Sequence, residues 1–363
     1  MAEKRVWNFN PGPATLPLAV LEKAKNEMVN YAGTGMSVME LSHRSKPYEA
    51  IQNDAKALLV ELFGIPKNYK ILFLQGGASL QFAMIPMNLL PPGKSADYVL
   101  TGYWAQKAYK EAKTLGTAKV AGTTEASHFN RIPESGELQL DSGAVYCHVT
   151  SNNTIFGTEW KTFPNTGSVP LIADMSSDIL SRRVDVGQFG LIYGGVQKNL
   201  GPAGVVVVII REDLVAAGRQ DIPTILRYAT HAENDSLFNT PPCYTIYIVK
   251  LVLEWVKGLG GMTAVEKRNE DKGKMLYGTI DGLKDFYKGT AEAKSRSLMN
   301  VTFRLPSEEL ENQFITEVKA AGFEGLKGHR SVGGVRVSMY NALEPEGIRQ
   351  LTDFMKAFAK KNG

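Results

Sequence analysis

The sequence predicts an α/β protein in which helices cover both faces of a mostly parallel sheet, followed by a smaller α+β domain. Short apolar runs alternate with helical patterns as far as Ile210, which is the pattern that strand–helix–strand units produce. Several of these runs are apolar throughout, as is typical of strands that are buried on both faces. The 363 residues are enough for about two domains.

Two amphipathic helices are expected before the first strand. Apolar residues recur at helical spacing over 18–31 and again over 47–64. The second segment has a proline in its first turn, and Gly64 and Pro66 follow as stop signals.

Six buried strands are expected after these helices. Each is a short run of mostly apolar residues, and such runs favour strands over helices when turn signals bound them. In a parallel sheet, ligands bind beyond the carboxyl ends of the strands, so the loops after these runs are where chemistry is expected. The expected strands are 71–74, 97–100, 144–149, 169–174, 191–195 and 204–210.

The pattern changes after a helical stretch over 244–256 and the glycine-rich segment 258–262. Strand-like runs at 299–305 and 335–340 flank a helical pattern over 307–322, and a last helix starts near Glu344. We therefore expect a large domain over 16–258 and a small α+β domain over 259–363, joined by the N-terminal segment 1–15.

The composition argues against several classes of function. The 41 Lys and Arg residues exceed the 37 Asp and Glu residues by only four, and no basic tract supplies the positive charge that nucleic-acid binding requires. The longest aliphatic run, 205–210, is far shorter than the roughly 20 residues that span a bilayer. The polar N-terminus has no signal-peptide core. We expect neither a nucleic acid nor a membrane as partner, and a cytoplasmic location.

Cysteine and histidine are too sparse for a disulfide framework or a zinc site. The chain has Cys147, Cys243 and five scattered histidines, and none shows clustered ligand spacing. We expect no metal.

A loop of small residues follows the strand at 71–74. Free N–H groups near Ala78 and Ser79, where a helix opens, would bind a phosphate with the help of the helix dipole. The alternative is a simple turn. The Gly-Lys-Ser sequence at 93–95 is no P-loop, because Asn88 stands where the first glycine is needed.

Three further side chains follow other strands. Asp174 either caps the next segment or pairs with a buried cation. Lys198 lies between apolar strands, and no other charged residue occurs between Asp185 and Arg211. Dry surroundings lower the pKa of a lysine and make it a nucleophile that can form a Schiff base. Trp104 either packs in the core or at an interface, or stacks on a flat cofactor ring.

Taken together, these features resemble the fold-type I pyridoxal-phosphate enzymes, and among them the phosphoserine aminotransferases of the class V family. The resemblance extends over essentially the whole chain and implies a seven-stranded sheet in the large domain. The matching segments, in order, are NFNPGPATLP (8–17), MELSHRSKPYE (39–49), QGGASLQFAMIPMNLL (75–90), TGYWAQKA (101–108), ADMSSDILSR (173–182), YGGVQKNLGPAG (193–204), NTPPCYTIY (239–247) and HRSVGGVRVSMYNA (329–342).

This resemblance implies pyridoxal 5'-phosphate as the cofactor, one per subunit, bound to Lys198 as a Schiff base. Lys198 would also be the general base that moves the substrate proton. It further implies a homodimer with shared active sites. The implied cofactor contacts are Asp174 at the pyridine nitrogen, Trp104 on the ring, Thr154 at the phenolic oxygen, Ala78, Ser79 and Gln197 at the phosphate, and Asn239 and Thr240 at the same phosphate from the neighbouring subunit.

The implied substrates are L-glutamate and 3-phosphooxypyruvate, which give 2-oxoglutarate and O-phospho-L-serine in serine biosynthesis. A longer phosphorylated oxo-acid of vitamin B6 synthesis is a further possible substrate. Arg336 matches the arginine that holds the α-carboxylate bidentately. Some relatives also carry an arginine in the phosphate loop, where this chain has Ala78, Ser79 and Leu80. The residues matching the cluster for the distal phosphate or carboxylate are His43, Arg44, His329 and Arg330, and the last two are our candidates for replacing that charge.

Three alternatives fit the residues less well. A cysteine desulfurase needs a reactive cysteine on a loop of the C-terminal domain, and no cysteine follows Cys243. Alanine–glyoxylate-type aminotransferases act on substrates without a distal phosphate, so two His-Arg pairs would serve no purpose in them. Taken alone, each of the two pairs is more typical of an exposed polar turn. A non-catalytic protein that binds phosphorylated ligands would have no use for a buried Lys198.

Overall fold

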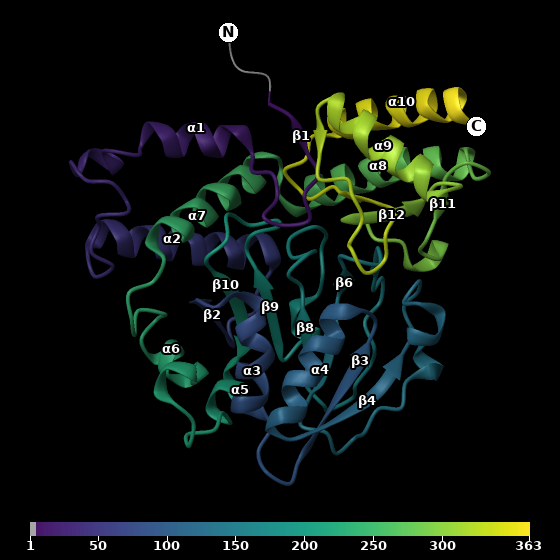
Figure 1. Ribbon diagram of the computed structural model, residues 1–363. Coiled ribbons are helices and arrows are strands. Elements are labelled where there is room, and N and C mark those ends of the chain that lie inside the picture. The colour runs from purple at the N-terminus through teal and green to yellow at the C-terminus, as the bar shows by residue number, and fades with distance from the viewer. Residues whose placement is uncertain (1–4) are drawn as a thin grey trace.

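The computed structural model describes residues 5–363, and its centre is a seven-stranded sheet (Figure 1). The strand order is β2-β10-β9-β8-β5-β3-β4. All strands run parallel except β10, which is antiparallel to both of its neighbours. This confirms the predicted mostly parallel sheet. The strands are β2 (Tyr69–Leu74), β3 (Ser95–Leu100), β4 (Thr117–Thr123), β5 (Cys147–Thr150), β8 (Leu171–Asp174), β9 (Leu191–Gly195) and β10 (Val206–Arg211).

The apolar pattern predicts six of these strands and misses β4. This strand lies at the edge of the sheet and pairs only with β3. Ala121 is its only buried residue. Because an edge strand with one buried side chain needs no apolar run, hydrophobicity gives no signal for it.

Helices cover both faces of the sheet. On one face α2 (Lys46–Phe63) and α7 (Cys243–Gly258) pack together over one hydrophobic core. On the other face α3 (Gly77–Leu89) and α4 (Tyr103–Leu115) cover a second core, and they cross in front of the strands in Figure 1. The remaining helices before residue 283 are α1 (Leu18–Asn26), α5 (Glu212–Ala216), α6 (Tyr228–Glu233) and α8 (Gly261–Gly282).

The first helix is shorter than the predicted 18–31. It ends at Asn26, and Tyr31–Gly33 form a separate 3-10 turn. The side chains of Asn30 and Thr34 bond to backbone groups of this turn, at Gly35 N and Tyr31 O. These local bonds compete with helical ones, so the helix stops although apolar residues continue at its spacing.

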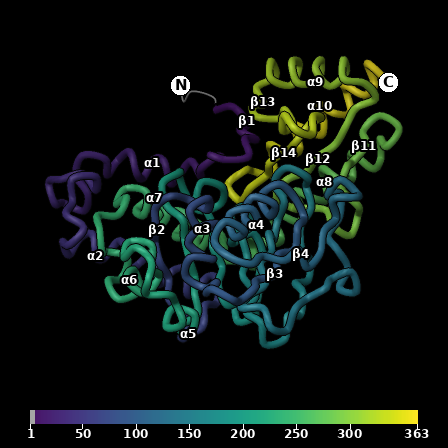
Figure 2. Tube along the Cα trace, turned by 60° about the horizontal axis from the view of Figure 1, so that its bottom comes forward, coloured from purple at the N-terminus to yellow at the C-terminus, as the bar shows by residue number. Residues whose placement is uncertain are grey.

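The C-terminal third builds a third core with its own small sheet, in the order β11-β12-β14. The N-terminal strand β1 (Trp7–Asn8) joins this part of the molecule, because it pairs with β13 (Phe323–Glu324) and Phe9 is buried in the same core. Figure 2 shows these segments together at one end of the molecule. The proposed domain boundary falls at the turn between α7 and α8 and stays a prediction. The other elements here are β11 (Lys288–Gly289), β12 (Asn300–Arg304), α9 (Glu308–Ala320), β14 (Val335–Ser338) and α10 (Pro345–Asn362).

Strands β6 (Asn152–Asn153) and β7 (Thr158–Glu159) form a hairpin beyond the end of β5. Among the helices of residues 5–363, none is long and apolar enough to cross a membrane.

A buried lysine fixes the segment that follows β14. Lys272 on α8 is fully buried. Its Nζ donates to the backbone oxygens of Met339 at 2.8 Å, Tyr340 at 2.8 Å and Leu343 at 3.3 Å. All three N–H bonds of the ammonium group are thereby used.

We predict that Lys272→Met lowers the free energy of unfolding by about 2–4 kcal/mol, because three buried carbonyls lose the Lys272 donor and only that of Tyr340 keeps another, from Leu343 N. Urea unfolding followed by circular dichroism at a fixed protein concentration measures this. Lys274→Met is the matched control, since Lys274 is exposed on the same helix, and should change stability by less than about 0.5 kcal/mol. Equal losses in both variants would contradict the assigned role of Lys272.

Candidate active site

A cavity of about 140 Å³ lies where the carboxyl ends of β2, β3, β5, β8 and β9 meet. This is the edge at which a parallel sheet is expected to bind ligands. Seven residues singled out from the sequence line it: Ala78, Ser79, Trp104, Thr154, Asp174, Gln197 and Lys198.

Lys198 lies in the turn after β9 and points its amine into the cavity. Its Nζ donates to Thr154 Oγ1 at 2.7 Å. The N-terminal segment closes over its stem: a Cβ at Gly12, where φ is +131°, would stand 3.2 Å from Lys198 Cγ. Burial lowers the pKa of Lys198 to about 8, and Arg336 contributes to this shift while Asp174 opposes it. Lys198 can therefore exchange a proton near neutral pH.

Asp174 ends β8 and is nearly buried, with 5% of its surface exposed. Its Oδ1 accepts hydrogen bonds from Ser176 N at 2.9 Å and Ser176 Oγ at 2.6 Å. Burial raises the pKa of Asp174, and the bonds from Ser176 and the charge of Lys198 lower it. The sequence left open whether Asp174 caps the next segment or pairs with a buried cation. Both interpretations hold in part, because the carboxylate caps the turn that follows it and also interacts electrostatically with Lys198.

The turn into α3 presents backbone N–H groups to the cavity. Gly76 and Gly77 have φ values of +82° and +62°, which glycine adopts without strain. The first amides of α3, at Gly77, Ala78 and Ser79, have no acceptor within the helix. Amides at the start of a helix favour an anion, and a phosphate is the expected one.

Trp104 is the second residue of α4 and forms another wall of the cavity. Tyr103 packs against it edge-on, with ring centroids 5.3 Å apart. The ring of His329 lies 6.0 Å from the Tyr103 ring. The loop before β14 therefore reaches the rim of the cavity.

Arg336 on β14 is a buried cation without a carboxylate partner in the described part of the chain. Its side chain is 6% exposed, and its Nε has no hydrogen-bond partner. Burial lowers the pKa of Arg336, and its charge in turn lowers the pKa of Lys198 and of His329, so it lies close to both. A buried guanidinium without a partner is costly, and a ligand carboxylate would offset that cost.

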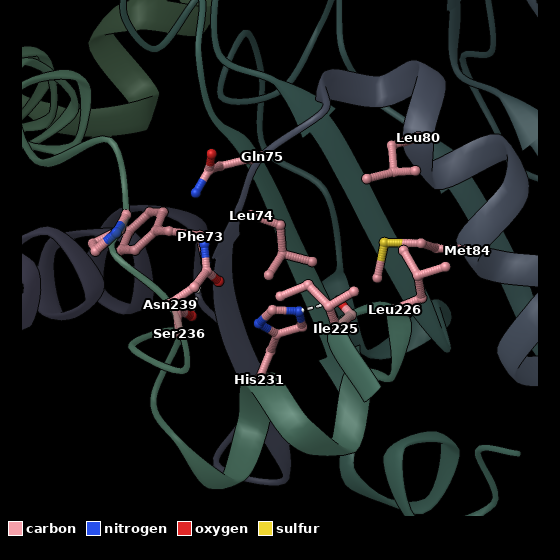
Figure 3. A pocket seen from close by; sticks show the side chains of 11 residues that line it. Phe73, Leu74, Gln75, Leu80, Met84, Ile225, Leu226, His231, Ser236 and Asn239 are labelled. Atoms are coloured by element: carbon pink, nitrogen blue, oxygen red, sulfur yellow. Dashed lines mark hydrogen bonds between the residues drawn. The ribbon is translucent and has the colours of Figure 1, made fainter. Parts of the chain in front are cut away.

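Seven predicted residues are absent from the walls of this cavity: His43, Arg44, Asn239, Thr240, His329, Arg330 and Arg336. His43 and Arg44 lie in the turn before α2. Asn239 lines a neighbouring cavity, and Figure 3 shows its side chain below that of Gln75. Gln75 Nε2 donates to the backbone oxygen of the exposed Thr240 at 3.1 Å.

The loop with His329 and Arg330 lines a separate pocket whose other charged side chains are Arg304, Lys327, Glu308 and Glu311, and Arg304 is paired with Glu311. The sequence analysis missed Ser176, although Asp-x-Ser is a common turn-capping pattern and could have indicated it. No group of three or more His, Cys, Asp or Glu side chains within residues 5–363 is arranged to hold a metal ion.

Comparison with known proteins gives full-length matches. Residues 6–351 match the family described as aminotransferase class-V. A phosphoserine aminotransferase of Lysinibacillus sphaericus is 55% identical over 359 residues, which are 99% of each chain. The structure of the phosphoserine aminotransferase from Bacillus circulans subsp. alkalophilus superposes with a TM-score of 0.97 at 55% identity and 99% coverage of each chain.

A solved structure of lower sequence identity has the same fold. The phosphoserine aminotransferase of Trichomonas vaginalis with bound PLP is 36% identical, with a TM-score of 0.92, over 97% of this chain and all of the other. The chain therefore belongs to the class V aminotransferase family, within its phosphoserine aminotransferases.

Proposed function

We propose that the protein is a pyridoxal-phosphate-dependent aminotransferase acting on L-glutamate and 3-phosphooxypyruvate, with 2-oxoglutarate and O-phospho-L-serine as products. The observation that carries the proposal is the juxtaposition of the nucleophilic Lys198, the buried Asp174 and the unpaired, buried Arg336. The close relatives named phosphoserine aminotransferase support the choice of substrates. Because phosphorylated anions cross membranes poorly, a cytoplasmic location is part of the proposal.

The residues around the cavity fit the cofactor group by group. The amides of Ala78 and Ser79 suit its phosphate, with Gln197 beside them. The Asp174 carboxylate suits a protonated pyridine nitrogen, and Trp104 can cover one face of the ring. Thr154, whose hydroxyl already contacts Lys198, suits the phenolic oxygen. When bound, pyridoxal phosphate supplies an aldehyde that reacts with amines and a ring that withdraws electrons from the substrate Cα.

Lys198 has two tasks in this proposal. Its neutral amine would attach the cofactor, and once a substrate amine had displaced it, the same Nζ would accept the proton from the substrate Cα and donate it to the carbon that carried the cofactor's aldehyde. A base works best when its pKa lies near the operating pH. The pKa of about 8 meets that condition, whereas an exposed lysine would be almost fully protonated.

Arg336 would hold the α-carboxylate that both substrates share. Its planar guanidinium can bind a carboxylate with two parallel hydrogen bonds, which fixes the direction of the Cα–H bond. The distal group would lie toward His329 and Arg330, since His329 is close to Tyr103 at the rim.

A second copy of the chain would complete each site. The family resemblance assigns Asn239 and Thr240 to the cavity of a partner subunit, and we assign His43 and Arg44, which are likewise absent from the cavity of their own chain, to the same place. Large apolar side chains stand exposed near these residues, and a second copy would cover them. These apolar residues are Leu18, Val29, Met36, Met39, Ile225 and Phe238.

We predict that Lys198→Ala and Lys198→Arg both abolish turnover, because arginine keeps the charge but cannot attach the cofactor. In the unmodified apoprotein, the rate at which added pyridoxal phosphate develops its bound absorption should fall about tenfold per pH unit below the lysine pKa of about 8, since only the neutral amine reacts. Stopped-flow absorbance from about pH 6 to about 9 measures this. A rate independent of pH would contradict the assignment.

We predict that Arg336→Ala lowers kcat/KM for both L-glutamate and O-phospho-L-serine by an amount equivalent to on the order of 2–4 kcal/mol. Arg336→Lys should recover part of this loss, because it keeps the charge without the bidentate geometry. Arg330→Ala should instead affect O-phospho-L-serine more than L-glutamate, because a phosphate carries more charge than a carboxylate. Steady-state kinetics with both amino acids test this, and unchanged kinetics in Arg336→Ala would exclude Arg336 from the site.

We predict that two inactive variants restore activity when their subunits are exchanged. One variant is Lys198→Ala, and the other combines Asn239→Ala with Thr240→Ala. A mixed dimer holds one intact site only if Asn239 and Thr240 serve the neighbouring subunit. Activity is measured before and after the mixture is dissociated and reassociated, with each variant treated alone as control. If both residues serve their own subunit, no activity returns.

A further inference from the structure

Asp174 belongs to a set of buried polar side chains on one face of the central sheet. Tyr193 is the direct partner of Asp174 across the β8–β9 pair. His148 is the partner of Ile172 across β5–β8, two residues before Asp174. Residues that face each other across parallel strands, or lie two apart on one strand, share a face of the sheet. Asp174, Tyr193 and His148 therefore project from the same face, which α3 and α4 cover.

These side chains are in contact and shielded from water. His148 Nε2 lies 2.9 Å from the Tyr193 hydroxyl oxygen. Tyr193 is fully buried and His148 is 1% exposed. Burial raises the pKa of Asp174, and hydrogen bonding from Ser176 and from the Tyr193 hydroxyl lowers it. The Tyr193 hydroxyl thus bonds to the imidazole and lies near enough to the Asp174 carboxylate to favour its ionised form.

The protons of this chain of groups can be assigned from their chemistry. An ionised carboxylate only accepts hydrogen bonds, so the nearby Tyr193 hydroxyl can serve Asp174 only as a donor. The Tyr193 oxygen is then free to accept, and the donor facing it is the Nε2–H of His148. Burial lowers the pKa of His148 to about 3, so its ring is neutral and carries this single N–H. The other nitrogen, Nδ1, is buried without a hydrogen-bond partner.

Packing fixes the direction of both rings. His148 stacks on Tyr98, with centroids 5.0 Å apart and an interplanar angle of 23°. The Tyr98 hydroxyl bonds to that of Tyr146 at 2.7 Å, so it does not compete for His148. Phe82 on α3 meets the Tyr193 ring edge-on at 6.3 Å. Burying Nδ1 without a hydrogen-bond partner lowers the stability of the protein. Such a cost is typical of a side chain that is retained for function rather than for packing of the core.

We propose that Tyr193 and His148 are positioning residues that hold Asp174 in its ionised form, and through it keep the pyridine nitrogen of the cofactor protonated. The inference rests on the proposed function, because it requires pyridoxal phosphate in the cavity. Other charges near Asp174 cannot take this role. Lys198 favours its ionisation but loses and regains a proton during the reaction, and Asp178 is a nearby carboxylate that opposes it. The Tyr193 hydroxyl is a donor of constant charge.

The test reads the pyridine nitrogen directly. The enzyme is loaded with pyridoxal phosphate carrying ¹⁵N in its ring, and the ¹⁵N chemical shift is followed from about pH 6 to about 10. In Tyr193→Phe the apparent pKa of this nitrogen should fall by about one pH unit, a tenfold change in its protonation, because one hydrogen bond to a charged group is lost. His148→Leu should shift it in the same direction by less, since the tyrosine hydroxyl remains but is no longer held.

Tyr98→Phe is the matched control, because it also removes a buried hydroxyl from the same layer but outside the chain to Asp174. It should titrate as the unmodified enzyme does. A folded Tyr193→Phe enzyme that binds the cofactor and titrates like the unmodified enzyme would overturn the proposal, and an unchanged His148→Leu enzyme would overturn the part assigned to His148. A protein that takes up no pyridoxal phosphate would contradict the proposed function instead.

Discussion

The chemistry of this site depends on the burial of one acid and one base at the same edge of the sheet. The parallel pairing of β8 and β9 brings Asp174 opposite Tyr193, and β9 ends two residues later, where the turn carrying Lys198 begins. In these dry surroundings burial lowers the pKa of Lys198 and raises that of Asp174, while each charge partly offsets the shift of the other. The same sheet edge therefore supplies a lysine that can lose its proton and a carboxylate that needs donors to remain ionised.

The sequence predicted the residues of the cavity wherever a simple topological rule applies. Ala78, Trp104, Asp174 and Lys198 each follow a different strand, and the carboxyl ends of parallel strands share one edge. The contacts behind them could not be predicted this way. His148 and Tyr193 lie on β5 and β9, two strands apart in the sheet, so their contact depends on the register in which both strands pair with β8. Local apolar patterns indicate which residues are buried, but not which side chain is reached across an intervening strand.

The burial of Arg336 could not be predicted from the sequence, for a different reason. The alternation in the strand around it places Val335 and Val337 in the C-terminal core, which puts Arg336 on the opposite face. An arginine on the outer face of a small sheet is normally solvated. Here that face meets the site, so the side chain is buried instead. Only the resemblance to a known family could assign Arg336 to a substrate carboxylate, because the packing of the small sheet on the large one leaves no trace in local patterns.

The chain is near neutral, with a formal charge of +4, and its surface charges largely pair with each other, whereas Arg336 is buried near Lys198 without a carboxylate partner in the described part of the chain. Arg349 with Glu346 and Arg296 with Asp281 are examples of surface pairs. The charge of Arg336 lowers the pKa of Lys198. A substrate carboxylate bound to Arg336 would cancel part of that repulsion, since opposite charges at contact neutralise each other's field. In the proposed reaction, substrate binding would therefore raise the pKa of Lys198 at the step where its Nζ accepts the proton from the substrate Cα.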